Sequence, residues 1–266
     1  MKERLGKLLG TLLFIVLISC LFYLIFFSNI KTNKGGIKMV ELTGNNLLSA
    51  NEYLTFAMLG DKSKYTGLTL PDIKKRFENH PYISKVDVED EGNNRVKVYL
   101  KEKNIEAVLL DGGEPHFISD NFEILPILST AKFTDLPIIS NSGNQNKIKS
   151  LSYLKTGNLI EAFKIIEASK LTNENMFKKL SEINLRNGGD IILSFSCLKP
   201  PVLFGHGGAA KKMIYLDLMW NSSEEGNNLI DSSEYIDLRF ADEIFVGPSI
   251  SELNSPAESP KNGLSE

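Results

Sequence analysis

The chain has 266 residues, of which 42% are hydrophobic and 24% charged, with a formal net charge of −3 at pH 7. This length suits one or two modest domains, and the composition excludes disorder as the main state of the chain. The mildly acidic balance offers no clustered basic surface for phosphate groups, so we expect no nucleic-acid partner.

An uncharged apolar run from Leu8 to Phe27 follows a short tip, residues 1–7, that carries Lys2, Arg4 and Lys7. A helix of twenty residues rises about 30 Å, the thickness of the hydrocarbon core of a bilayer. The basic residues favour retention of the tip in the cytoplasm. A cleaved signal peptide would have a shorter apolar core that ends in small residues. The run therefore predicts one span of the inner membrane, with a cytoplasmic tip and extracytoplasmic domains.

Residues 36–103 have the pattern of a small α+β domain. A brief strand is expected at 37–42. Ser49 and Glu52 have the spacing of a capping box, which predicts the start of a helix, and Gly60 is expected to end it.

A second helix is expected to begin at Thr69 and to end before Pro81. Residues 86–100 then alternate between apolar and polar types around a turn at 91–94, which predicts a hairpin with one face in water. The order strand, helix, helix, strand, strand, together with the segment His80–Val86, resembles a POTRA domain. The resemblance implies a module that docks other proteins.

Residues 104–247 are expected to form a second, β-rich domain with an extended sheet and flanking helices. Helices are predicted after an Asn158 cap and over 209–220. From Pro248 onward polar residues and proline dominate, so the tail 248–266 is expected to be disordered. Short apolar segments between turns predict strands at 107–110, 117–120, 124–127, 136–139, 183–185, 191–195, 235–240 and 244–246.

The sequence has few residues that are candidates for catalysis or metal binding. His80, His116 and His206 lack the spacing of metal ligands, and we expect each at the surface or at a cap. The glycines of 205–212 lack the Gly-Lys-Ser/Thr end of a phosphate loop, so they predict a flexible turn before a helix. Ser196-Cys197 lies on a predicted strand without the turn that exposes a nucleophile. We therefore expect no enzyme, no metal, no cofactor and no small-molecule substrate.

Several short motifs occur in succession between residues 101 and 246. These are Lys101–Ala107, Phe117–Asp120, Leu136–Ile139, Phe204-Gly205 with Lys211 or Lys212 a few residues on, Tyr235–Phe240 and Ile244–Val246. In this order they resemble the FtsQ/DivIB family of bacterial cell-division proteins. The first motif matches only in part, because Lys103 stands where the family has arginine and Ile105 where it has proline. The family's glycine after the third motif is missing.

The resemblance implies a non-enzymatic, membrane-spanning scaffold of the divisome that links early and late division proteins at the septum. It implies partners of the FtsB and FtsL type on the β-rich domain and other divisome proteins on the POTRA domain. The sheet edge after Asp237 is expected to accept a partner strand. The candidate partner-binding residues are Arg239, Phe240, Asp242, Ile244, Phe245 and Val246.

Arg239 has a second interpretation, which is a structural pair with a carboxylate of its own domain, and both stay open. Two other functions are also weighed. A POTRA-bearing component of a membrane assembly or secretion system would need a many-stranded barrel at the C-terminus. A membrane-anchored hydrolase would need a convergent nucleophile and base.

Overall fold

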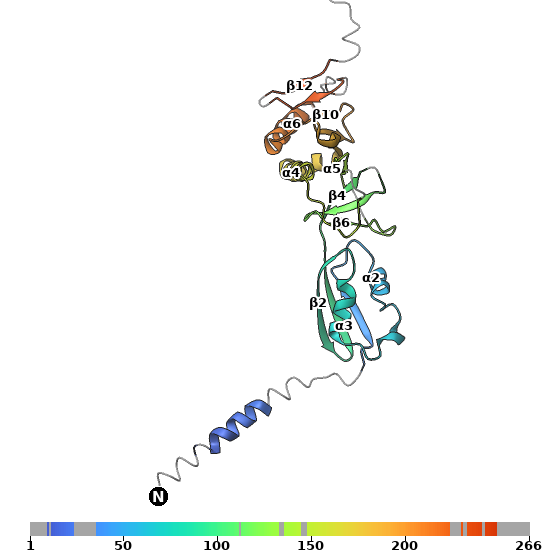
Figure 1. The fold of residues 1–266 in the computed structure, drawn as a ribbon, viewed down its shortest axis with the longest axis vertical. Coiled ribbons are helices and arrows are strands. Elements are labelled where there is room, and N and C mark those ends of the chain that lie inside the picture. Colours follow the sequence, from blue (N-terminus) through green and yellow to red (C-terminus); the bar gives the residue numbers. More distant parts are fainter. Residues whose placement is uncertain are drawn as a thin grey trace, which may run out of the picture. The chain divides into compact units, whose positions relative to one another are not determined.

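The computed structural model describes residues 10, 12–23, 36–111, 113–132, 136–144, 148–223, 230, 233–240 and 243–248. The fold of these residues is α+β (Figure 1). The chain divides into two compact units. Unit 1 takes its described residues from Met1–Thr43, Ala50–Glu78 and Val86–Leu100, and unit 2 from Gly44–Ser49, Asn79–Lys85 and Lys101–Glu266.

The predicted transmembrane helix from Leu8 to Phe27 is not supported. Among the described residues, no helix combines the length and the apolar character that a membrane crossing needs. The tip 1–7, the rest of the apolar run and the tail from residue 249 lie outside the described residues.

Unit 1 contains most of a three-stranded sheet. Its strands are β1 (Met39–Thr43), β2 (Ile83–Gly92) and β3 (Arg95–Glu102), in the order β1-β3-β2, with β1 parallel to β3. Asn93 and Asn94 turn the hairpin with φ of 51° and 66°, the backbone that a tight two-residue connection needs. Along β3, buried Val96, Val98 and Leu100 alternate with more exposed residues, which confirms the predicted hairpin with one wet face.

Unit 1 also contains two short helices and a 3-10 turn: α2 (Ala50–Phe56), η1 (Lys62–Tyr65) and α3 (Leu70–Glu78). At the start of α3, Thr69 Oγ1 accepts from the Asp72 amide at 3.3 Å, and the Asp72 carboxylate accepts from the Thr69 amide at 3.1 Å. The predicted helix start at Thr69 is thus confirmed, and its geometry is that of a reciprocal cap.

Helix α2 ends earlier than predicted. Met58 adopts a φ of 58°, and the amides of Met58 and Leu59 donate to the carbonyls of Thr55 and Leu54. This pair of bonds closes the helix with Met58 in the left-handed position that glycine usually takes. Gly60, two residues later, is therefore not the residue that stops α2.

Unit 2 is built on one nine-stranded mixed sheet with the order β12-β11-β10-β9-β8-β7-β4-β5-β6. Figure 1 shows β10 and β12 towards one end of this unit and β4 and β6 towards the other. The strands are β4 (Ile105–Leu110), β5 (His116–Ser119), β6 (Ile124–Leu125), β7 (Ile138–Ser140), β8 (Leu180–Asn184), β9 (Ile192–Phe195), β10 (Val202–Leu203), β11 (Ile236–Asp237) and β12 (Phe245–Val246).

One row of residues, paired from strand to strand across this sheet, is buried in the core, and we call it the register row. Its fully buried members, in strand order from β4 to β11 along the sheet, are Leu109, Ile139, Ile183, Leu193, Val202 and Ile236. Helices α4 (Gly157–Thr172) and α6 (Ala209–Ser223) add Leu159, Ala162 and Met213 to the same core. Each fully buried aliphatic side chain contributes about 1.5–3 kcal/mol. This row therefore positions β11 and the segment that leads from it into β12.

Two helix details differ from the sequence prediction. The cap of α4 is Thr156, whose side chain accepts from the Leu159 amide, while Asn158 donates to the Ser142 carbonyl at 2.9 Å. The short α5 (Glu174–Lys179) was not predicted. Its cap Asn173 accepts from two amides of the first turn.

His80 is buried rather than at the surface, with 3% of the residue exposed. Its Nδ1 accepts from the Tyr82 amide at 3.1 Å, so this nitrogen carries no proton. The Tyr82 hydroxyl in turn donates to the Pro126 carbonyl at 2.7 Å and accepts from the Leu128 amide. Burial, with a smaller contribution from Lys103, lowers the pKa of His80 to about 4. His80 is thus a neutral hydrogen-bond acceptor of the fold.

We expect the free energy of unfolding to fall as the pH decreases from about 6.5 to about 4, because of His80. Because its folded pKa lies below the unfolded value of about 6.5, the neutral form is favoured by folding. Its contribution is complete above pH 6.5 and falls by about 3 kcal/mol as the pH approaches 4. Urea unfolding between pH 7.5 and 4.5 measures this slope. His80→Asn, which keeps an acceptor at the same position, should remove the slope between pH 7.5 and about 5.5, where carboxylates remain ionised in both states, and His116→Asn should keep it. A slope that persists in this range in His80→Asn would contradict this assignment.

Candidate functional site

Of the six predicted site residues, the structure places Arg239, Phe240, Ile244, Phe245 and Val246 at the β12 end of the unit 2 sheet. The elements at this end are β10, the loop from Phe204 to Gly208, helix α6, and the strands β11 and β12. Gly205, Gly207 and Gly208 have φ of 64° to 65°, which glycine adopts without strain. This succession of left-handed residues turns the chain from β10 into α6.

A buried lysine holds that loop in place. Lys212 is 9% exposed, and its Nζ donates to the carbonyls of Phe204 at 2.6 Å and His206 at 3.0 Å. The same ammonium lies 4.9 Å from the centre of the Phe204 ring. Burial lowers the pKa of Lys212. Of the two lysines in the predicted motif, Lys212 is thus the one that serves the fold, while Lys211 is exposed.

Arg239 pairs with carboxylates of its own unit. Its guanidinium contacts Asp237 through Nε and Nη2, at 2.9 and 2.6 Å, and Asp190 through Nη1 at 2.9 Å. These hydrogen bonds hold the pKa of Asp237 below its usual range. A Cβ on Gly205 would lie only 2.9 Å from Arg239 Cγ, so the arginine stem packs directly on the loop. The structural interpretation of Arg239 thus accounts for its contacts. Asp190, 49 residues away in sequence, gave no signal that would have linked it to Arg239.

The aromatic candidates form an exposed pair. Phe240 and Phe245 are 54% and 45% exposed, and their rings meet edge to face with centroids 4.9 Å apart. Val246 is 43% exposed, although it continues the buried register row through its partner Ile236. Ile244 packs against the core, and Asp242 lies outside the described residues.

Strand β12 is an outer strand of the sheet, and its backbone orientation is fixed by the ladder. Gly247 donates to the Tyr235 carbonyl at 2.9 Å, so residues 245 and 247 turn their polar groups towards β11. The amide and carbonyl of Val246 therefore point away from β11. Gly247 also packs closely on the Tyr235 ring, since a Cβ there would meet it at 2.6 Å.

The opposite edge of the sheet is covered. Residues 151–154 lie along β6, where the Ile124 amide donates to the Ser152 carbonyl at 2.8 Å and the Leu151 amide donates back to Ile124 at 2.7 Å. No strand lies beyond β12 in the described part of the chain. The two ends of the sheet therefore differ, and β12 is the one that offers a regular edge.

The other candidate residues for chemistry each make contacts of their own. His206 Nδ1 contacts Glu161 at 2.5 Å, and His116 Nδ1 lies 2.9 Å from the Glu114 carbonyl. Ser196-Cys197 lies in the turn after β9, not within a strand as predicted. Within the described ranges, no group of three or more His, Cys, Asp or Glu side chains is placed to hold a metal ion.

No family model matches the chain. A curated relative is the cell division protein FtsQ of Geotalea daltonii, which is 23% identical over 244 residues. The similarity covers 92% of this chain and 87% of the relative. It therefore extends well beyond the short motifs of residues 101–246, and it confirms the resemblance that these motifs indicate.

Proposed function

We propose that this chain is a non-enzymatic scaffold of the bacterial division machinery that captures a partner strand along the open edge of β12. The observation that carries the proposal is the asymmetry of the sheet. One edge is closed by residues 151–154, and the other ends in β12 with the amide and carbonyl of Val246 turned outward. Extended peptides add to such an edge through main-chain hydrogen bonds.

The side chains beside this edge support a protein partner. Phe240, Phe245 and Val246 place exposed apolar surface around the strand, and large exposed apolar groups are typical of binding surfaces. The similarity to a cell division protein suggests which partner class to test, namely the FtsB- and FtsL-type proteins of the septum. Ile244 would act by packing β12 on the core.

Residues 36–103 are proposed as the POTRA-type docking module of the same scaffold, and residues 104–247 as the FtsQ-type β domain. The order β1, α2, α3, β2, β3 is the support for the first assignment. Other divisome proteins are the proposed partners of this module.

A fluorescent fusion of the full chain in dividing cells tests the role in division. We expect rings at mid-cell that coincide with constriction. The matched test of the edge is a fusion shortened before Phe240, which should lose FtsB- and FtsL-type proteins in a pull-down. An even distribution of the full-length fusion along the cell would refute the division role, and capture by the shortened fusion would refute the edge.

A further inference from the structure

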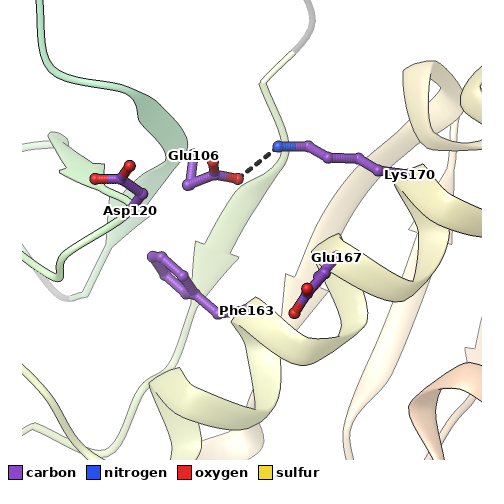
Figure 2. Close-up of a pocket in the computed structure, with 5 residues that line it drawn as sticks. All are labelled: Glu106, Asp120, Phe163, Glu167 and Lys170. Carbon is purple, nitrogen blue, oxygen red and sulfur yellow. Dashed lines mark hydrogen bonds and ion pairs between the residues drawn. The ribbon is translucent and has the colours of Figure 1, made fainter.

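A pocket of about 300 Å³ lies beside α4 in unit 2 (Figure 2). It is lined by Glu106 of β4, Asp120 directly after β5, and Phe163, Glu167 and Lys170 of α4. Strands β4 and β5 stand near the β6 end of the sheet order. The pocket is therefore separate from the edge proposed to bind a partner strand.

The charges of the lining are not balanced. Three carboxylates face one ammonium, which gives the lining a formal charge of −2. Lys170 Nζ contacts Glu106 Oε2 at 2.6 Å, and this pair is the dashed line in Figure 2. Asp120 accepts from the neutral Asn104 amide at 3.0 Å. The charges of Asp120 and Glu167 are thus not neutralised within the lining, and a cation would be attracted.

An aromatic wall adds a second feature suited to a cation. The Phe163 ring is stacked on Phe122, with centroids 4.4 Å apart and an angle of 27° between the rings. Lys155 already occupies the Phe122 ring, with its ammonium 5.2 Å from the ring centre. The ring that lines the pocket is that of Phe163, and it offers a cation the same kind of attraction.

From this combination we infer that the pocket binds the guanidinium of an arginine side chain presented by a partner polypeptide. A guanidinium is planar, stacks on aromatic rings, and presents several donors in one plane to carboxylates on either side. The inference is independent of the β12 edge and of the division role.

The test uses the full-length protein and N-acetyl-argininamide as the probe, followed by NMR titration. We expect saturable binding with a dissociation constant on the order of 1 mM, a typical strength for one side chain. The citrulline analogue, which has the same shape without the charge, should bind at least tenfold more weakly. Added salt should also weaken the arginine complex. Equal binding of the two probes, or no saturable binding, would overturn the inference.

Three variants locate the site. The double change Asp120→Asn and Glu167→Gln should weaken binding at least tenfold, and both residues are exposed, so the fold should persist. Lys170→Met should strengthen binding severalfold, because it frees Glu106 for the probe. The control Glu174→Gln removes an exposed carboxylate that pairs with Lys178 on α5 and should change nothing. An unaltered affinity in the double variant, with its unfolding temperature unchanged, would reject this pocket as the site.

Discussion

Val246→Pro should weaken capture of the partner strand on the order of 100-fold while unit 2 remains folded. Proline removes the one amide of β12 that points away from β11, as the bond from Gly247 to the Tyr235 carbonyl indicates. The ladder between β11 and β12 does not use this amide, and proline is tolerated on edge strands. A lost hydrogen bond and an unsatisfied partner carbonyl together cost about 2–4 kcal/mol, which weakens binding on the order of 100-fold.

Matched changes separate the backbone from the side chain at this position. Val246→Ala shortens an exposed side chain but keeps the amide, so it should retain most of the binding. Phe245→Pro instead removes an amide that faces β11 and should destabilise the strand itself. The measurements are partner affinity by calorimetry and unfolding in urea. Equal affinities of Val246→Pro and Val246→Ala would show that β12 does not bind its partner through its main chain.

Gly205→Ala should destabilise unit 2 by about 2–3 kcal/mol. One part of the cost is the left-handed backbone at Gly205, which is about 1–2 kcal/mol less favourable for a residue with a Cβ. The other part arises because the new Cβ would lie 2.9 Å from Arg239 Cγ. The arginine must then move, which weakens its hydrogen bonds to Asp237 and Asp190.

Gly207→Ala is the control for the backbone term. Gly207 has a φ of 65°, close to the 64° of Gly205, but nothing lies within 4 Å of a Cβ placed there. The difference between the two variants therefore isolates the contact with Arg239. This difference should shrink in an Arg239→Ala background, as a double-mutant cycle in urea would measure. If the two alanine variants are equally stable, the packing of Arg239 on the loop does not contribute to folding.

Local patterns predicted the elements whose causes are local. The alternation along β3 was visible because side chains of a strand change face at every residue. The start of α3 was visible because Thr69 and Asp72 carry the cap within one turn. Prediction failed where two local signals compete: Thr156 rather than Asn158 caps α4, and Met58 rather than Gly60 closes α2.

Little in the sequence indicated that residues 151–154 cover the outer edge of β6. Residues 151–154 alternate Leu, Ser, Tyr and Leu, a run too short to predict a pairing, and their partners lie almost thirty residues upstream. Nothing in the sequence indicated the pocket beside α4, because it joins Glu106 to Lys170 across 64 positions of the chain. Contacts of this kind depend on strand order and register, which no local pattern contains.

The amino-acid sequence alone was enough to predict the α+β class of the chain, the principal helices and strands, and the resemblance to a cell-division family, because periodicity, caps and short motifs are local properties. It also indicated Phe240, Phe245 and Val246 as candidates. The folded chain was needed to show that Arg239 pairs with Asp237 and Asp190 and that β12 is the outermost described strand at one end of the sheet. Both depend on the register row that aligns β4 with β11, since only that packing brings residues distant in sequence to the same end of the sheet.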